Sequence, residues 1–432
     1  MEKNLSFENL PGQDSIRRVE FENGITLLVY NNNHSRSVNL IGLLNCGSAY
    51  DPTEKQGLAH FTATMLTRGT KNLDFSSYHQ TLEESGANLS FSCGARHTWF
   101  HGQSLSEDID MLIELAADSL INPGFQTIYV ERLRKQLIAS LAIRDQDASD
   151  VSSLLFDRLL FPDHPYGNPV NGSVVSVSAI TDKDIADFHK NYYQSNGMVI
   201  AVTGAVDPEH VHKLIQRYFT NWTGEEPSLD SIPALPSPPN QLIRQHIPLE
   251  EKSQSDLVMG TFGPKRAHPD YLPAYLGNNI LGQFGLMGRI GESVRSRSGL
   301  AYYASSSLSG WVDGGLWEFS AGTNPENLEK TIALIQDEIK NYLASTVTNE
   351  ELSDSRSHLI GRLPLSLESN AGLANAILTM ERFNLGLDYY QKYAGLLQSI
   401  TADQILETAR KYLHPEHLVI ASAGAGGEVS DK

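Results

Sequence analysis

Cysteine is scarce in this chain: only Cys46 and Cys93 occur among its 432 residues. Two cysteines are too few for a disulfide framework or for a metal site built from four thiolates, so the sequence fits neither class of protein. We expect both to be free thiols that pack as small hydrophobic side chains.

Positive charge and long apolar runs are also lacking. Lys and Arg number 33 against 51 Asp and Glu, a net charge of −18. Because nucleic-acid binding depends on clustered Lys and Arg, we expect no nucleic-acid partner. No run approaches the roughly 18 apolar residues of a membrane helix, so we expect no membrane association. The first 25 residues are rich in acid and lack the apolar core of a signal peptide, which predicts a cytoplasmic protein.

The length of the chain and one proline-rich segment predict two domains. A chain of 432 residues exceeds one compact core of roughly 150 to 200 residues. Five prolines lie between positions 227 and 239, where they exclude a helix or a central strand. We therefore expect an N-terminal domain over 1–222, a stiff linker over 223–246 and a C-terminal domain over 247–432.

An internal repeat relates the two halves. Residues 179–205 align without gaps on residues 399–425, at an offset of 220, with nine identical positions. Each copy is predicted to be a helix followed by a buried strand. Thr401 with Gln404 has the spacing of a capping box, and Thr181 with Asp184 has the same spacing. The repeat therefore predicts two domains that arose by duplication.

Local patterns predict an α+β fold, with each domain a mostly antiparallel or mixed sheet that has helices packed on one face. In the second half, Asn324 with Pro325 and Thr348 with Glu351 mark two helix starts. In the first half, strands are expected at 24–30, 37–46, 87–93 and 97–104, and helices at 57–67, 76–85 and 107–120.

The segment 57–70, GLAHFTATMLTRGT, is the most specific motif in the chain. It resembles the M16 peptidase signature, in which GLAHFLEHMLFRGT or a near variant carries an inverted zinc motif, H-x-x-E-H. The resemblance extends from Asn23-Gly24 through 163–167 to Leu281-Gly282 and the segment 299–302. It implies the fold of the M16 metallopeptidases, a family that includes pitrilysin, insulinase and the mitochondrial processing peptidases.

The chain departs from this motif at the positions that bind and activate zinc. In H-x-x-E-H two histidines on one helix face share the metal, and the glutamate activates the zinc-bound water. Here only His60 is kept, while Ala63 replaces the glutamate and Thr64 the second histidine. The resemblance places Ser140 at the third ligand, normally a glutamate in a later helix. Since a catalytic zinc needs three protein ligands, we expect no metal and no cofactor in this chain.

Other histidines do not form a replacement site in the sequence. His97 and His101 fall on a predicted strand, where a spacing of four residues separates two side chains by roughly 13 Å. His210 and His212 lie two apart on a predicted helix and point to different faces. His60 itself is interpreted as a retained framework residue, with binding to a partner group or to a stray metal as the alternative.

The second half keeps a different part of the family pattern. Arg295 precedes Tyr302 by seven residues across a predicted helix-to-strand turn, and Gly299-Leu300-Ala301 lies between them. This resembles the Arg-Tyr pair of M16 peptidases, which contacts substrate and helps stabilise the oxyanion at the zinc site. A guanidinium and a phenol can both donate to a carbonyl oxygen that gains charge. Arg297 is a nearby competitor, although the spacing favours Arg295.

One strand of the first half also differs from the family. Active members have a strand near G-A-x-x-N-A-x-T that pairs with extended substrate, and this chain has Ser90-Phe91 in place of the asparagine-alanine pair. Pairing through the backbone does not depend on those side chains, so peptide binding by strand addition stays possible.

Together these patterns predict the non-zinc-binding subunit of a two-chain M16-type metalloendopeptidase. Its partner would be an M16-type chain with an intact H-x-x-E-H, which carries the zinc, and its substrate an unfolded peptide. The chain is predicted to be inactive alone. The alternatives are a structural or assembly subunit like the M16-derived core proteins of respiratory complexes, and an autonomous peptidase with unrecognised ligands.

Overall fold

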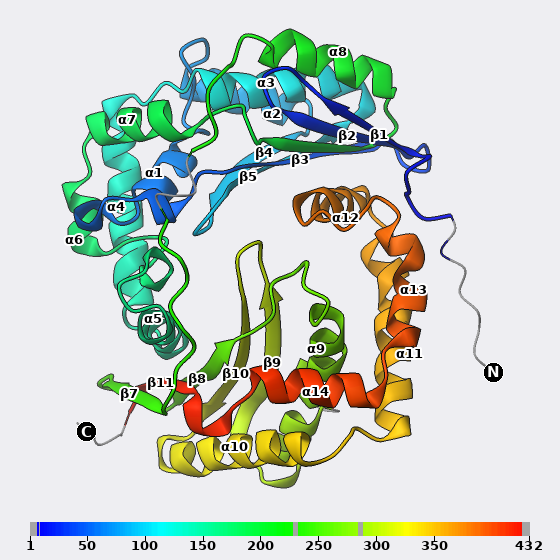
Figure 1. Ribbon diagram of the computed structural model, residues 1–432. Helices are drawn as coiled ribbons and strands as arrows, with labels where there is room; N and C mark the ends of the chain where they lie inside the picture. The colour runs from blue at the N-terminus through cyan, green and yellow to red at the C-terminus, as the bar shows by residue number, and fades with distance from the viewer. Residues whose placement is uncertain (1–6, 8, 228–231, 284–287, 426–432) are drawn as a thin grey trace. The chain divides into compact units, whose positions relative to one another are not determined.

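The computed structural model describes residue 7 and residues 9–227, 232–283 and 288–425. The chain forms two compact units, coloured by residue number in Figure 1. The first unit consists of Met1–Leu141, Pro169–Pro233 and Pro364–Lys392, and the second of Ala142–Asn168, Ala234–Leu363 and Tyr393–Lys432. Each unit therefore includes a segment from the opposite half of the sequence.

The first unit contains a mixed six-stranded sheet of order β1-β2-β6-β3-β5-β4. Only β2 and β6 pair in parallel, and the other four pairings are antiparallel. The strands are β1 (Ile16–Glu20), β2 (Thr26–Asn31), β3 (Ser37–Leu44), β4 (Asn88–Cys93), β5 (Thr98–Leu105) and β6 (Val199–Gly204).

Helices cover both faces of this sheet, as Figure 1 shows for α3 and α8 on one side and α12 on the other. A Cβ at Gly102 of β5 would lie 3.0 Å from Leu112 of α3, whereas Trp99 of β5 points to the opposite face and stacks on Arg382 of α12. The helices of this part of the chain are α1 (Leu58–Met65), α2 (Phe75–Glu84), α3 (Ile109–Ile121), α4 (Thr127–Arg144), α6 (Val174–Ala179), α7 (Asp182–Tyr192), α8 (Pro208–Phe219) and α12 (Asn370–Arg382).

The second unit contains a mixed five-stranded sheet of order β7-β11-β8-β10-β9, in which only β7 and β11 are parallel. The strands are β7 (Ile243–Pro248), β8 (Ser255–Phe262), β9 (Ala301–Gly310), β10 (Gly315–Thr323) and β11 (Val419–Gly424). The remaining helices are α5 (Ala148–Leu160), α9 (Tyr271–Asn278), α10 (Leu328–Ala344), α11 (Asn349–Ser366), α13 (Tyr389–Ser399) and α14 (Ala402–Tyr412).

Helix α5, from the N-terminal half of the sequence, packs on one face of this second sheet. Phe156 and Leu160 join Val258 and Val419 in one buried apolar cluster. On the opposite face, Trp317 Nε1 donates a 2.8 Å hydrogen bond to Asn278 of α9. The core of the second unit therefore depends on a helix that lies far from its strands in the sequence.

The two units repeat one topology. The order β2-β6-β3-β5-β4 in the first sheet matches β7-β11-β8-β10-β9 in the second, with β1 as an addition. The bounds of β11 and α14 lie 220 residues after those of β6 and α7, and those of α11 and α12 lie 222 residues after those of α4 and α5. The predicted duplication is confirmed, and it extends well beyond the segment recognised from sequence.

Most predicted elements of the first half are confirmed to within two residues at each end. The predicted capping boxes at Thr181 and Thr401 both form, as does a reciprocal pair of bonds between Thr348 and Glu351. The predicted α+β fold, with two mixed sheets that have helices packed on them, is also confirmed. The expectation of helices on only one face is wrong, because α12 covers the first sheet on the face opposite α3, and α9 contacts the second sheet on the face opposite α5. Strand β1 was missed because three of its five residues are charged, which hides its apolar alternation.

Two further features bear on the sequence predictions. Strand β7 begins at Ile243, inside the segment expected as a linker and just after its last prolines. Within the described residues, no helix combines the length and apolar character needed to cross a membrane.

Candidate functional site

Helix α1, which carries the segment that resembles the family's zinc motif, starts at a constrained turn. Gly57 has φ +91°, and a Cβ there would lie 2.7 Å from the carbonyl oxygen of Asn171, so glycine is required. The Asp51 carboxylate accepts hydrogen bonds from the backbone N–H groups of Gly57 (2.7 Å) and Ala59 (2.8 Å). Burial raises the pKa of Asp51 to about 7. The N-terminus of α1 is thus held in place by the preceding loop.

The three motif positions on α1, at residues 60, 63 and 64, are fully or partly buried. His60 is half-buried, and burial lowers the pKa of its imidazole, which favours the neutral form. Ala63 is fully buried. The Thr64 hydroxyl donates a 2.8 Å hydrogen bond to the carbonyl oxygen of His60 one turn earlier. That hydroxyl is therefore satisfied by its own helix.

Ser140 lies on α4, the helix that neighbours α1. The Arg134 guanidinium carbon lies 5.4 Å from the centroid of the Phe61 ring, and Arg68 Nη2 reaches Gln136 Oε1 at 3.4 Å. Ser140 follows Gln136 by one helical turn and is exposed. The resemblance thus assigns ligand positions to two helices that are joined by the contact between Arg134 and Phe61.

The residues at these positions do not fit a catalytic zinc. Zinc in such sites takes nitrogen, sulfur or carboxylate oxygen from three protein side chains, and His60 is the one such donor among the four positions. Over the described ranges, no group of three or more His, Cys, Asp or Glu side chains is arranged to hold a metal ion. The expectation that the chain binds no metal remains a prediction.

Three of the other histidines considered from sequence have separate partners, and the fourth, His101, is exposed on β5. His97 precedes β5, is buried, and accepts a 3.1 Å hydrogen bond at Nδ1 from Arg382 Nη2. His210 Nε2 contacts Asp110 at 2.6 Å, whereas His212 Nδ1 contacts Arg17 at 3.2 Å. No two of these three imidazoles share a hydrogen-bond partner in these contacts.

The two cysteines are free thiols. Cys46 is fully buried, and burial raises the pKa of its thiol to about 12. Cys93 is partly buried at the end of β4, and its pKa is also raised by burial. Both thiols are accordingly poor nucleophiles at neutral pH.

Arg295 of the second unit lies on an irregular helix. The segment Gly291–Arg297 is a π-helix. This geometry is rare in proteins overall, but where it occurs it is often at a functional site. Its C-terminal end is closed by Gly299, whose N–H donates to the Arg295 carbonyl at 3.1 Å and whose φ is +63°. The Arg295 side chain is exposed and forms no hydrogen bond or ion pair with the described residues. Arg297, the competitor, lies 3.5 Å from the Glu292 carboxylate.

Tyr302 lies at a β-bulge. In the pairing of β10 with β9, Gly322 is opposite Tyr303 and Thr323 is opposite Ala301, so Tyr302 has no partner on β10. The side chain of Tyr302 is 61% exposed. Because a bulge inserts one extra residue, it re-aims the side chain that it carries. Arg295 and Tyr302 therefore both lie on irregular backbone, one on the π-helix and the other at the bulge.

Strand β4 lies at one edge of the first sheet. Ser90 is exposed there, and the ring of Phe91 is half-buried with its centroid 6.2 Å from that of Phe100. An edge strand has backbone N–H and C=O groups that can pair with an extended peptide.

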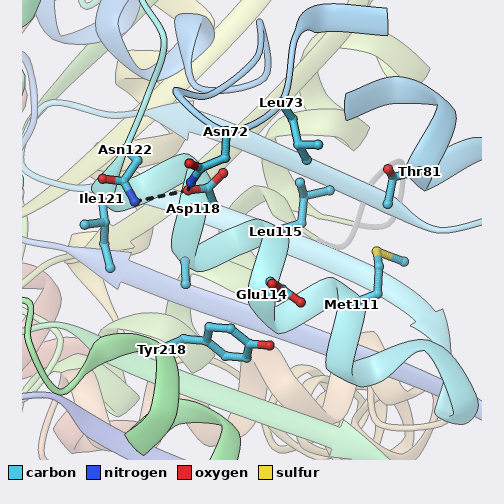
Figure 2. A pocket seen from close by; sticks show the side chains of 11 residues that line it. Asn72, Leu73, Thr81, Met111, Glu114, Leu115, Asp118, Ile121, Asn122 and Tyr218 are labelled. Carbon is cyan, nitrogen blue, oxygen red and sulfur yellow. Dashed lines mark hydrogen bonds between the residues drawn. The ribbon is translucent and has the colours of Figure 1, made fainter. Parts of the chain in front are cut away.

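The first unit also contains a pocket of about 470 Å³ between α2, α3 and α8 (Figure 2). Asp118 Oδ1 accepts hydrogen bonds there from the amides of Asn72 (2.6 Å) and Asn122 (3.1 Å). None of the site residues predicted from sequence lines this pocket.

Comparisons with known proteins identify the family. Residues 27–172 match the insulinase (peptidase family M16) model, and residues 179–359 match the peptidase M16 inactive-domain model. The chain belongs to the M16 peptidase family. The order of the two models along the chain is that of an M16 N-terminal domain followed by an M16 inactive domain.

Relatives and solved structures agree with this assignment over almost the whole M16 chain. It is 25% identical over 392 residues to an uncharacterized zinc protease of Mycobacterium leprae, covering 88% of this chain and 86% of that protein. It is 24% identical to one of Rickettsia bellii, covering 91% and 93%. A crystal structure of a peptidase M16 inactive domain from Pseudomonas fluorescens superposes with a TM-score of 0.89, at 26% identity and coverage of 96% and 99%.

Proposed function

We propose that this M16 chain is the non-zinc-binding subunit of a two-chain metalloendopeptidase in the cytoplasm. A second M16 chain with an intact H-x-x-E-H would carry the zinc, and this chain would supply Arg295 and Tyr302 as substrate contacts. The substrate class is unfolded peptide.

The observation that carries this proposal is the contrast between two sets of residues. The positions assigned to zinc chemistry hold Ala63, Thr64 and Ser140, which cannot ligate or activate water. By contrast, the segment with Arg295 and Tyr302 keeps the family spacing, and both side chains are exposed. An inactive remnant has no physical need for an exposed guanidinium without a partner among the described residues, or for an exposed phenol at a β-bulge seven residues later.

The chemistry of the two side chains fits substrate binding and charge stabilisation. The guanidinium of Arg295 offers a fixed fork of N–H donors, and the phenol of Tyr302 offers one O–H donor. Both can donate to a peptide carbonyl oxygen, and the bonds strengthen as that oxygen gains negative charge. The zinc of the partner chain would activate the attacking water. The exposed backbone of β4 offers a second contact by strand addition to an extended peptide.

The relatives support a proteolytic role. Those from Mycobacterium leprae and Rickettsia bellii carry the description zinc protease, and the chain covers most of the length of each. Loss of the zinc ligands with retention of the whole fold favours a chain that acts on peptide together with another.

The test is reconstitution with an M16 chain that has an intact H-x-x-E-H, beginning with any such chain encoded in the neighbouring reading frame. Hydrolysis of an unfolded peptide should be found only in the mixture. Arg295→Ala or Tyr302→Phe should lower kcat/KM of the mixture by about 10²-fold, the effect of losing one oxyanion donor. Arg297→Ala serves as the matched control. Unchanged activity in both variants refutes the proposed role, and a stable complex without hydrolysis indicates an assembly subunit instead.

A further inference from the structure

We infer that Tyr303, Gly322 and Asp256 form a positioning device for Tyr302. The three residues lie side by side in one row across three strands. Asp256 of β8 is opposite Gly322 of β10, and Gly322 is opposite Tyr303 of β9. The Tyr303 hydroxyl donates a 2.8 Å hydrogen bond to Asp256 Oδ1, so the phenol spans the central strand to reach the third.

Glycine at position 322 is what allows this crossing. A Cβ on Gly322 would overlap the Tyr303 ring, and it would lie 2.6 Å from the Gln254 amide nitrogen and 2.9 Å from Asp256 Oδ1. An aromatic ring that covers a glycine on the neighbouring strand pins the register of the pair. The register of β9 is therefore held at Tyr303, immediately beside the bulge.

The acceptor of this bond is itself held in place. Gln254 Nε2 donates to both carboxylate oxygens of Asp256, at 2.8 and 3.0 Å, and Asp256 is 5% exposed. Burial and the hydrogen bond to Asp256 raise the pKa of Tyr303, with Ser149 of α5 acting in the opposite direction. The phenol of Tyr303 thus stays protonated and remains a donor.

The consequence falls on Tyr302, the unpaired residue of the bulge. No ladder hydrogen bond partner on β10 fixes Tyr302, so its direction depends on the residues on either side. Ala301 is fixed by its pairing with Thr323, and Tyr303 by its bond to Asp256. With both neighbours fixed, the Cα–Cβ bond of Tyr302 has a defined direction, and this limits where its ring can lie.

The inference rests on the proposed function only for the idea that Tyr302 contacts substrate. Its structural part, the positioning of Tyr302, can be tested without a partner chain. The full chain is labelled with 3-fluorotyrosine, and the ¹⁹F resonance of Tyr302 is identified by its loss in Tyr302→Phe. In Tyr303→Phe this resonance should narrow and move toward that of free fluorotyrosine. Tyr412→Phe is the matched control, because it removes another tyrosine-aspartate hydrogen bond, 3.0 Å to Asp270, from the same unit. An unchanged Tyr302 resonance in Tyr303→Phe overturns the inference.

A second test uses the reconstituted peptidase. Tyr303→Phe should lower kcat by about tenfold with little change in KM. A Tyr302 hydroxyl that is out of position loses chiefly the hydrogen bond to the oxyanion, which forms in the transition state. The double variant Tyr302→Phe/Tyr303→Phe should be no slower than Tyr302→Phe alone, because Tyr303 acts through Tyr302. Additive losses overturn the inference. A shifted ¹⁹F resonance with normal activity in Tyr302→Phe refutes the proposed function and leaves the positioning intact.

Gly322→Ala provides an independent variant, because it displaces the ring and keeps every hydroxyl. Its effect on the Tyr302 resonance should equal or exceed that of Tyr303→Phe, with circular dichroism used to establish that the sheet is retained. A folded Gly322→Ala chain with an unshifted Tyr302 resonance also overturns the inference.

Discussion

Thr64 Oγ1 donates its hydrogen bond to the carbonyl oxygen of His60, at 2.8 Å, in the helix where the family motif has a second histidine. A threonine hydroxyl bonded to the carbonyl four residues earlier is satisfied within its own helix. The side chain of Thr64 therefore needs no metal ion to satisfy its hydroxyl. Helix α1 thus forms with a threonine at the position where the family motif has a histidine.

Zinc binding should return when the missing donors are restored. The double variant Thr64→His/Ser140→Glu adds one imidazole and one carboxylate. Together with the imidazole of His60, they give three ligands on α1 and α4. We expect about one zinc per chain in the variant and none in the parent protein, measured by elemental analysis after dialysis. His60→Ala added to the double variant is the control and should abolish binding. Stoichiometric zinc in the parent chain would contradict the assignment of these positions.

Asn370 at the start of α12 should be essential to the first unit. Its Nδ2 donates to the Ser37 carbonyl at 2.7 Å, its Oδ1 accepts from Asn32 at 2.7 Å, and it is 4% exposed. Asn370→Ala leaves the partly buried Asn32 amide and Ser37 carbonyl without this partner, so the free energy of unfolding should fall by about 1 to 2 kcal/mol. Denaturant titration measures this loss. Asn375→Ala, on the exposed side of the same helix, should change it by less than about 0.5 kcal/mol. Equal effects of the two substitutions would show that α12 is not anchored as described.

Gly299, which closes the π-helix, should resist substitution because of its backbone and not for lack of space. Its φ is +63°, and no atom lies within 4 Å of a Cβ built there. Gly299→Ala should cost about 1 kcal/mol of unfolding free energy, and Gly299→Asn less, because Asn tolerates this conformation. Gly361→Ala is the control: it also has open space, but it lies within α11 and should be neutral or stabilising. A neutral Gly299→Ala would exclude conformational strain as the reason for glycine.

His189 should make stability depend on pH between about 6.5 and 4. Burial lowers the pKa of His189 to about 4, and its Nε2 lies 2.8 Å from the Leu120 carbonyl oxygen, which assigns the proton to Nε2. In this window the unfolded chain takes up a proton that the folded chain does not, so the free energy of unfolding decreases as the pH falls. His189→Gln does not titrate here, and the decrease from pH 7 to pH 4.5 should be smaller by about 2 kcal/mol.

The measurement for His189 is a series of denaturant titrations at fixed pH values on the parent chain and on the glutamine variant. The other buried histidines titrate in both proteins, so they cancel in the comparison. Parallel pH profiles for the two proteins would contradict the assignment to His189.

The candidate site was inferred from residue types at fixed local spacings, and it stays a prediction. Ala63 and Thr64 at the motif positions and the seven-residue step from Arg295 to Tyr302 can be seen in the chain alone. The bulge at Tyr302 and the crossing of Tyr303 to Asp256 could not be seen, because they depend on which residues of three strands face each other. The adjacent residues Tyr302 and Tyr303 nevertheless gave a signal for an irregular strand. In a regular strand two neighbouring side chains point to opposite faces, so the two tyrosines would not be equally buried or exposed.

The fold divides in a similar way between local and long-range causes. Capping residues such as Thr181 and Thr401, and the apolar runs after them, act within a few residues, so helix starts, strands and the duplication follow from the sequence. The exchange of α5 and α12 between the halves does not, because a helix with an apolar stripe carries no mark of which sheet it covers. That choice is made by long-range packing, in which Phe156 meets the second sheet and Asn370 meets the first. Tertiary structure alone decides that α5 packs on the second sheet and α12 on the first, because only the assembled sheets present the apolar surfaces that bury the side chains of these helices.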